Sequence, residues 1–162
     1  MKQGSSISNL DVSIFDDSNM NLWILLDQAR DVIAKCREME LNHFQLTRVQ
    51  ASVLYILISE GRGMSISEIS NWNLKELHSV LSLINRMAKI GLVTKNKENG
   101  KIKIAITEDG INAYISSTRR SIEMIFSSLD DSEKKQFEII LKKIRSKGRE
   151  LLGIGFKPAF LP

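Results

Sequence analysis

The feature that most constrains this chain is a change of hydrophobic period at Gly91. Before this glycine, apolar residues recur at helical spacing, whereas residues 92–97 and 101–106 alternate with a period of two. Asn99 and Gly100 separate the two alternating segments, and this dipeptide is typical of a tight β-hairpin turn. Residues 92–106 therefore predict a hairpin of two short strands. In the second strand Ile102, Ile104 and Ile106 share one face, which is expected to be buried, while Lys101 and Lys103 share the other.

Two short helices are predicted directly before this hairpin. Ser65 and Glu68 have capping-box spacing, which predicts a helix to about residue 70. Asn73 and Glu76 repeat the pattern and predict the start of a second helix, ended by Gly91. The inward face of that second helix is predicted to hold Val80, Leu83, Ile84 and Met87. Two helices followed by a hairpin form a winged helix-turn-helix.

Longer helices are predicted on both sides of this unit. Residues 19–39 have one apolar face, and Thr47 predicts the cap of a helix that ends before Gly61. After the hairpin, Thr107 predicts the cap of a helix to about residue 127, and a last helix covers residues 130–152. The apolar stripes of the outer helices exceed what so small a core can cover, so we expect a homodimer.

The expected fold class is mainly α with a small β-hairpin wing, a winged helix-turn-helix with long N- and C-terminal dimerisation helices. Four regions are expected along the chain. They are an N-terminal arm (1–18), an N-terminal dimerisation helix (19–45), a DNA-binding lobe (46–107), and C-terminal dimerisation helices with a tail (108–162).

Composition argues against several other classes of protein. The chain has 162 residues, of which 43% are hydrophobic, and a formal charge of +4. Its single cysteine, Cys36, allows no internal disulfide and lies on an apolar helix face, where a small hydrophobe is expected rather than a redox sensor. No run approaches the roughly 18 apolar residues of a membrane span. We expect a cytoplasmic protein without a membrane partner.

Catalytic and metal-binding motifs are also missing from the sequence. His43 and His78 are its two histidines, and together with one cysteine they give no recognisable metal-ligand spacing. There is no nucleophile elbow and no phosphate-binding loop. We therefore expect no enzyme activity, no metal and no cofactor.

Several short segments resemble the MarR family of bacterial and archaeal regulators over about residues 20–152. They are Leu46 and Thr47 with Gln50, Val53 and Leu54, then residues 66–69, Arg86 and Met87, residues 91–93, and residues 106–110. The resemblance implies a transcriptional regulator, acting as a repressor, that binds a pseudopalindromic operator in double-stranded DNA as a homodimer.

The resemblance also implies a small aromatic or phenolic effector, bound between the dimer helices and the lobe, that releases the DNA. The candidate lining residues are Trp23, Asp27, Arg30, Phe44 and Tyr55. Aromatic residues at helical spacing are also common in plain hydrophobic cores, and that alternative stays open here.

The predicted recognition helix carries the candidate DNA-binding residues. The second helix of a helix-turn-helix enters the major groove, and its N-terminal residues face the bases. We expect His78, Ser79 and Ser82 at base edges, and Lys75 on phosphate or guanine, with Arg86 on the same side. The alternative is a solvated polar helix face.

The predicted wing is rich in lysine, at positions Lys95, Lys97, Lys101 and Lys103. Lysines there suit phosphate neutralisation, although lysine also protects exposed strand edges from pairing. MarR-like wings often carry an aspartate and, two residues later, an arginine. Glu98 and Gly100 stand at those positions, so Lys97 or Lys101 would have to replace the arginine.

A winged helix used only for protein interaction is the alternative function. Such a surface would need apolar anchors on the outward face of the recognition helix. Lys75, His78, Ser79 and Ser82 are polar and favour DNA, whereas Leu77 and Leu81 favour the alternative.

Overall fold

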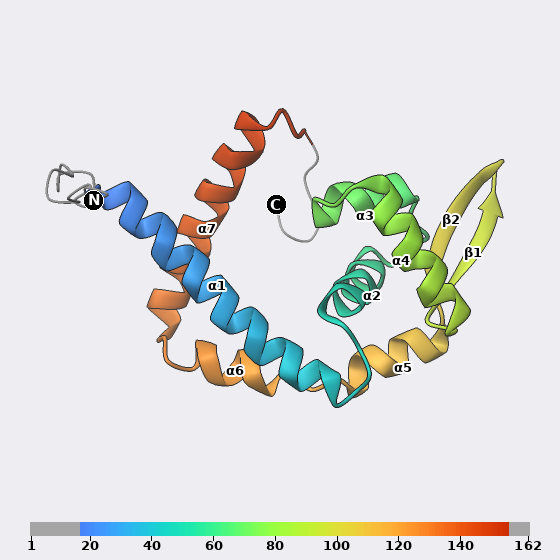
Figure 1. Ribbon diagram of the computed structural model, residues 1–162, viewed down its shortest axis with the longest axis horizontal. Coiled ribbons are helices and arrows are strands. Elements are labelled where there is room, and N and C mark those ends of the chain that lie inside the picture. Colours follow the sequence, from blue (N-terminus) through green and yellow to red (C-terminus); the bar gives the residue numbers. More distant parts are fainter. Residues whose placement is uncertain (1–16, 156–162) are drawn as a thin grey trace, which may run out of the picture.

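The computed structural model describes residues 17–155, which form an elongated helical arm and a lobe that carries the hairpin (Figure 1). The arm contains α1 (Ser18–Asn42), α6 (Arg120–Phe126) and α7 (Asp131–Leu151). The lobe contains α2 (Arg48–Glu60), α3 (Ile66–Asn73), α4 (Leu77–Lys89), β1 (Val93–Glu98), β2 (Lys101–Ile106) and α5 (Glu108–Ser116). Most of the expected arm at 1–18 and of the expected tail lies outside the described residues.

The lobe is built around α2, which is buried on more than one side. Val53, Leu54, Ile56 and Leu57 of α2 are all buried, and α3, β2 and α5 pack against this helix. Neighbouring elements contribute Ile69, Ile84, Met87 and Ile104 to the same core. The lobe therefore holds the principal hydrophobic core of the described chain. Burial of each such side chain contributes about 1.5–3 kcal/mol to the stability of the fold.

The hairpin forms where the alternating pattern predicts it. Val93 pairs with Ile106 and Glu98 with Lys101, in antiparallel register. Asn99 and Gly100 both have positive φ, as a tight hairpin turn of this kind requires. At the base of the wing, Ile104 also exchanges two backbone hydrogen bonds with Met64, at 2.9 and 2.7 Å.

One face of β2 was expected to be buried, and this holds only near the lobe. Ile104 is fully buried, but Ile102 is 58% exposed because the outer half of the hairpin projects beyond the core (Figure 1). The predicted buried side of the wing is therefore wrong for Ile102. The alternation of a strand predicts which side chains share a face. The position of the core determines how many of those side chains are buried.

Three predicted helix caps are confirmed. Thr47 and Ser65 form reciprocal capping boxes with Gln50 and Glu68, and the Thr107 hydroxyl accepts from the backbone of Gly110. In each case the cap satisfies backbone N–H groups that have no partner inside the helix.

The predicted cap at Asn73 is wrong, because α3 continues to this residue. The Asn73 amide donates to the carbonyl of Ile69 at 3.1 Å, and its oxygen accepts from the Ser52 hydroxyl at 2.8 Å. Leu74 then ends α3 in the left-handed conformation, and α4 follows Glu76, whose side chain makes no capping bond. Contacts with α2 thus occupy the side chain that was expected to cap α4.

The single helix expected over residues 107–127 is also wrong. The chain leaves α5 at Ser117, which has an extended backbone and is buried, and resumes helical structure in α6. This break turns the chain so that α6 packs against α1. Among the described residues, no helix is long and apolar enough to cross a membrane.

Candidate nucleic-acid interface

The two sides of α4 differ sharply in exposure. Val80, Leu83, Ile84 and Met87 are buried against the lobe, as predicted. The side chains that point away from the core are exposed, namely Leu77, His78, Ser79, Leu81, Ser82, Asn85, Arg86 and Lys89. We refer to these eight residues as the outward face of α4. It contains all the expected base-reading residues, together with Arg86.

Two residues of the expected base-reading set are in contact. The Ser79 hydroxyl lies 3.3 Å from Nε2 of His78, and both groups remain exposed. Each can donate or accept a hydrogen bond, depending on the tautomer of the imidazole. This pair therefore offers both kinds of group to a partner.

A cavity of about 420 Å³ lies beside α4. It brings Lys75, Ser79 and Arg86 of the predicted set together with residues of α2 and α3. The residues that line it are Thr47, Val49, Asn73, Lys75, Ser79, Val80, Leu83 and Arg86. Two cationic side chains at one cavity suit an anionic group such as a phosphate oxygen.

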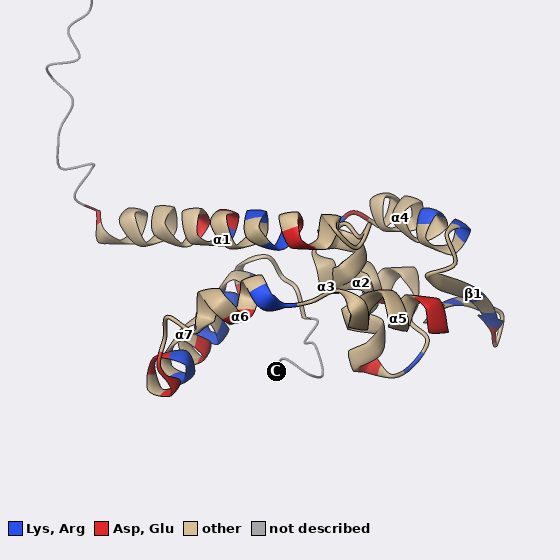
Figure 2. Ribbon diagram, turned by 90° about the horizontal axis from the view of Figure 1, so that it is seen from below, with Lys and Arg blue, Asp and Glu red and all other residues tan. Residues whose placement is uncertain are grey.

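The four predicted wing lysines fall into two groups. Lys97 and Lys101 are exposed next to the hairpin turn. Figure 2 shows basic residues at that end of the wing. Lys95 donates to the side chain of Asn85 on α4, and Lys103 lies 3.2 Å from a carboxylate oxygen of Glu68. The inner lysines therefore join the wing to the helices, and the outer two present their charge to solvent.

Glu68 connects three elements at the base of the wing. Its carboxylate accepts from Arg62 at 2.8 Å and from Ser65 at 2.7 Å, as well as from Lys103. Burial alone would raise the pKa of Glu68, but these hydrogen bonds outweigh it and hold the pKa at about 2. An ionised Glu68 thus anchors β2 to the start of α3.

A second carboxylate, Glu40, joins α1 to α6 and to the segment that connects α5 to α6. It accepts from Arg37 at 2.8 Å, from the Thr118 hydroxyl at 2.6 Å and from the Ser121 hydroxyl. Burial would raise its pKa, yet the hydrogen bonds from Ser121, Thr118 and Arg37 lower it to about 2. We call these four residues the Glu40 cluster. Sequence reasoning missed it because its two halves lie far apart in the chain.

The expected effector residues do not come together within one chain. Trp23, Asp27 and Arg30 lie in α1, where Arg30 is paired with Asp27 at 2.9 Å. Phe44 follows the C-terminal end of α1, and Tyr55 lies in α2. Trp23 is separated from the end of α1 by about 28 Å, given a rise of 1.5 Å per residue.

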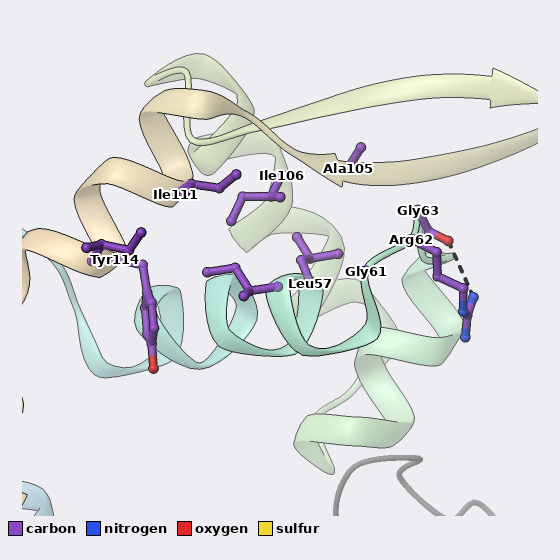
Figure 3. Close-up of a pocket in the computed structure, with 10 residues that line it drawn as sticks. Leu57, Gly61, Arg62, Gly63, Ala105, Ile106, Ile111 and Tyr114 are labelled. Atoms are coloured by element: carbon purple, nitrogen blue, oxygen red, sulfur yellow. Dashed lines mark hydrogen bonds between the residues drawn. The ribbon is translucent and has the colours of Figure 1, made fainter.

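The ring of Tyr55 instead packs against Tyr114, with centroids 6.0 Å apart. Tyr114 lines a different cavity, of about 470 Å³, between α2, β2 and α5 (Figure 3). Most of the cavity is apolar, with Leu57, Ile106 and Ile111 on its walls and the backbone of Gly61 at one side. Burial raises the pKa of the Tyr114 hydroxyl above its ordinary value of 10.0.

The arm leaves a large apolar surface exposed. Leu22, Trp23, Leu25 and Val32 of α1 are each 60–64% exposed. No residue of α7 is buried, and its Ile139, Ile140 and Ile144 are exposed as well. Residues 18–26 carry no charge, and the start of α1 is uniformly uncharged in Figure 2. We call the surface formed by these exposed apolar residues of α1 and α7 the apolar arm face. Cys36, on the same helix, is half-buried.

No protein-family model and no curated protein sequence matches this chain. Solved structures do match. The ligand-free form of an organohalide-sensing transcriptional regulator is similar over 93% of this chain and 89% of its own, with a TM-score of 0.72 and 22% identity. AbsC, a MarR family transcriptional regulator from Streptomyces coelicolor, gives a TM-score of 0.73 and 19% identity, covering 83% of this chain and 96% of AbsC.

A third similar structure is MepR of S. aureus, solved in complex with DNA. It has a TM-score of 0.67 and 20% identity, and the match covers 76% of this chain and 93% of MepR. The fold of this chain is therefore the winged-helix fold of MarR-type regulators, with seven helices and a two-stranded antiparallel hairpin in the described residues. The expected fold class is confirmed.

Proposed function

We propose that this protein is a transcriptional regulator that binds duplex DNA through α4 and the wing. The observation that carries the proposal is the outward face of α4. It is a helix face beside a basic hairpin, with the hydrophobic core entirely on its other side. A helix presented in this way fits the major groove, and lysines beside it neutralise phosphates.

Individual residues are proposed for distinct roles on the DNA. His78, Ser79 and Ser82 would contact base edges, and Asn85 can join them when its contact with Lys95 opens. Lys75 and Arg86 both line the cavity beside α4 and would bind phosphate. Of the wing lysines, the exposed Lys97 and Lys101 would contact phosphates directly, while Lys95 and Lys103 would hold the wing in place.

A homodimer is proposed because the apolar arm face has no partner within the described chain. An exposed apolar surface that includes Leu22, Trp23 and Leu25 costs free energy in water, and a second copy would cover it. Two subunits could then hold their α4 helices about 34 Å apart, one turn of DNA, and read a pseudopalindrome.

An effector is proposed to bind the apolar cavity between α2 and α5. One similar regulator is described in a form bound to 2,4-dichlorophenol, which is a phenolic compound. The apolar walls of this cavity suit such a ligand. The ligand would release DNA only by binding more tightly to a state in which the α4 helices are differently spaced. Without the ligand, the regulator would stay on its operator and act as a repressor.

The test is selection of duplexes from a randomised pool by the purified full-length protein. The selected and random duplexes are then titrated across salt, with stoichiometry from sedimentation. We expect an enriched pseudopalindrome, bound by two subunits, with affinity that falls steeply as salt rises. Absence of salt-sensitive binding to any duplex would favour a winged helix used for protein interaction, with Leu77 and Leu81 as anchors.

A further inference from the structure

Two large apolar residues interrupt the otherwise polar outward face of α4. Leu77 is 55% exposed and Leu81 is 45% exposed, one helical turn apart. Both lie outside the buried set of Val80, Leu83, Ile84 and Met87. The polar contacts proposed above assign them no role, and exposed leucines on a binding surface usually meet an apolar group of the partner.

The surroundings of these leucines indicate what that partner is. Their neighbours on the outward face are His78, Ser82 and Asn85, and the ammonium of Lys95 reaches Asn85 from the wing. Protein-docking anchors are normally surrounded by further apolar residues in a pocketed patch. Two leucines among hydrogen-bonding and cationic groups fit instead a polyanion that presents small apolar groups at intervals.

Duplex DNA presents such a group in its major groove. The C5-methyl of thymine is the one apolar substituent there, and side chains that contact it distinguish thymine from cytosine. We propose that Leu77 and Leu81 read thymine methyl groups, so that the operator carries thymines beneath the N-terminal half of α4. This inference rests on the proposed DNA-binding function.

The spacing of the leucines agrees with the spacing of base pairs. Four residues of helix advance about 6 Å, whereas successive base pairs are about 3.4 Å apart. With α4 along the groove, the two side chains would reach thymines one or two base pairs apart. Each leucine would then cover a different methyl group, and His78 and Ser82 would contact the polar edges beside them.

The experiment uses a duplex that the wild-type protein selects from a randomised pool. Each thymine is replaced in turn by deoxyuridine, which removes the methyl group and keeps every hydrogen-bonding edge. Affinity is measured by fluorescence anisotropy for wild type, Leu77→Ala, Leu81→Ala and the control Met124→Ala. Met124 is 64% exposed but belongs to α6, outside the outward face of α4.

We expect the wild-type protein and Met124→Ala to lose about fourfold in affinity at each contacted thymine. Leu81→Ala should lose its sensitivity at one of these positions and keep it at the other, with Leu77→Ala showing the converse. Circular dichroism melting checks that each variant is folded.

Two failures are distinguishable. If no duplex is enriched, the proposed DNA-binding function itself fails. In the second failure, a duplex is enriched while deoxyuridine leaves the affinity of wild type unchanged, or changes the affinities of both leucine variants at the same positions. In either case the proposed function stands and thymine reading is overturned. Unchanged DNA affinity of both leucine variants would likewise overturn it and assign the leucines to a protein partner.

Discussion

The hydroxyl of Thr118 donates a 2.6 Å hydrogen bond to the carboxylate of Glu40, which lies 78 residues earlier in the chain. This contact belongs to the Glu40 cluster, which binds the end of α1 to the break between α5 and α6. The cluster therefore lies beside the segment that connects α5 of the lobe to α6 of the arm.

Glu40→Gln should make stability less dependent on pH. The pKa of Glu40 is lowered from 4.5 to about 2, so its ionised form stabilises the fold above pH 4.5, and this contribution is lost as pH falls toward 2. We expect the variant to be less stable by about 1–3 kcal/mol at pH 7, with the gap narrowing toward pH 2. Urea denaturation of both proteins across this range measures the gap.

The matched control for that measurement is Glu138→Gln, because Glu138 is an exposed residue of α7 paired with Lys142. Its gap from wild type should be small at every pH, as expected for an exposed ion pair. A gap for Glu40→Gln that stays constant down to pH 2.5 would contradict the prediction.

Gly110→Ala should destabilise the lobe strongly. A Cβ at this position would lie 2.2 Å from the carbonyl oxygen of Leu92 and 2.9 Å from a side-chain carbon of Ile106. The resulting shift of α5 away from the wing should cost about 1–3 kcal/mol. Gly148→Ala is the control, since a Cβ there meets nothing within 4 Å, and it should stabilise α7 by about 0.5–1 kcal/mol. Equal thermal melting shifts would refute the close approach.

Ser79→Ala and Lys101→Ala should affect DNA binding in different ways. Loss of a base contact weakens binding to the selected duplex by about 1–3 kcal/mol and leaves random DNA nearly unchanged. Loss of a phosphate contact at Lys101 weakens both and reduces the salt slope by about 1. Salt titrations with the selected and random duplexes separate the two cases. Equal losses on both duplexes for Ser79→Ala would remove this residue from base readout.

Leu25→Asp should convert the proposed dimer to monomer. Leu25 is 63% exposed in the middle of the apolar arm face, and a carboxylate there would have to be buried by the partner without a counter-charge. Sedimentation velocity should show at least a tenfold weaker association. Ile102→Asp is the control, because Ile102 is exposed to a similar degree on the wing and should leave the dimer intact. A dimer that survives Leu25→Asp would place the interface elsewhere.

Sequence alone predicted the features of this protein that depend on neighbours within about four residues. The cap at Thr47, the capping box at Ser65, the buried face of α4 and the turn at Asn99 and Gly100 are all confirmed. Each depends on a local hydrogen bond or on the period of one element, and both are visible in a short window of sequence. The order of helices and hairpin in the lobe, and with it the fold class, followed from these local signals.

Tertiary structure alone decided where side chains found partners in other elements. Asn73 was expected to cap α4, but it bonds to Ser52 of α2 instead, and the helix expected over 107–127 breaks where α1 supplies Glu40. Lys103 is likewise held by Glu68, 35 residues away, while Lys101 stays exposed. Such pairings depend on which elements pack against one another in the fold. The spacing of residues along one helix or strand does not predict these contacts.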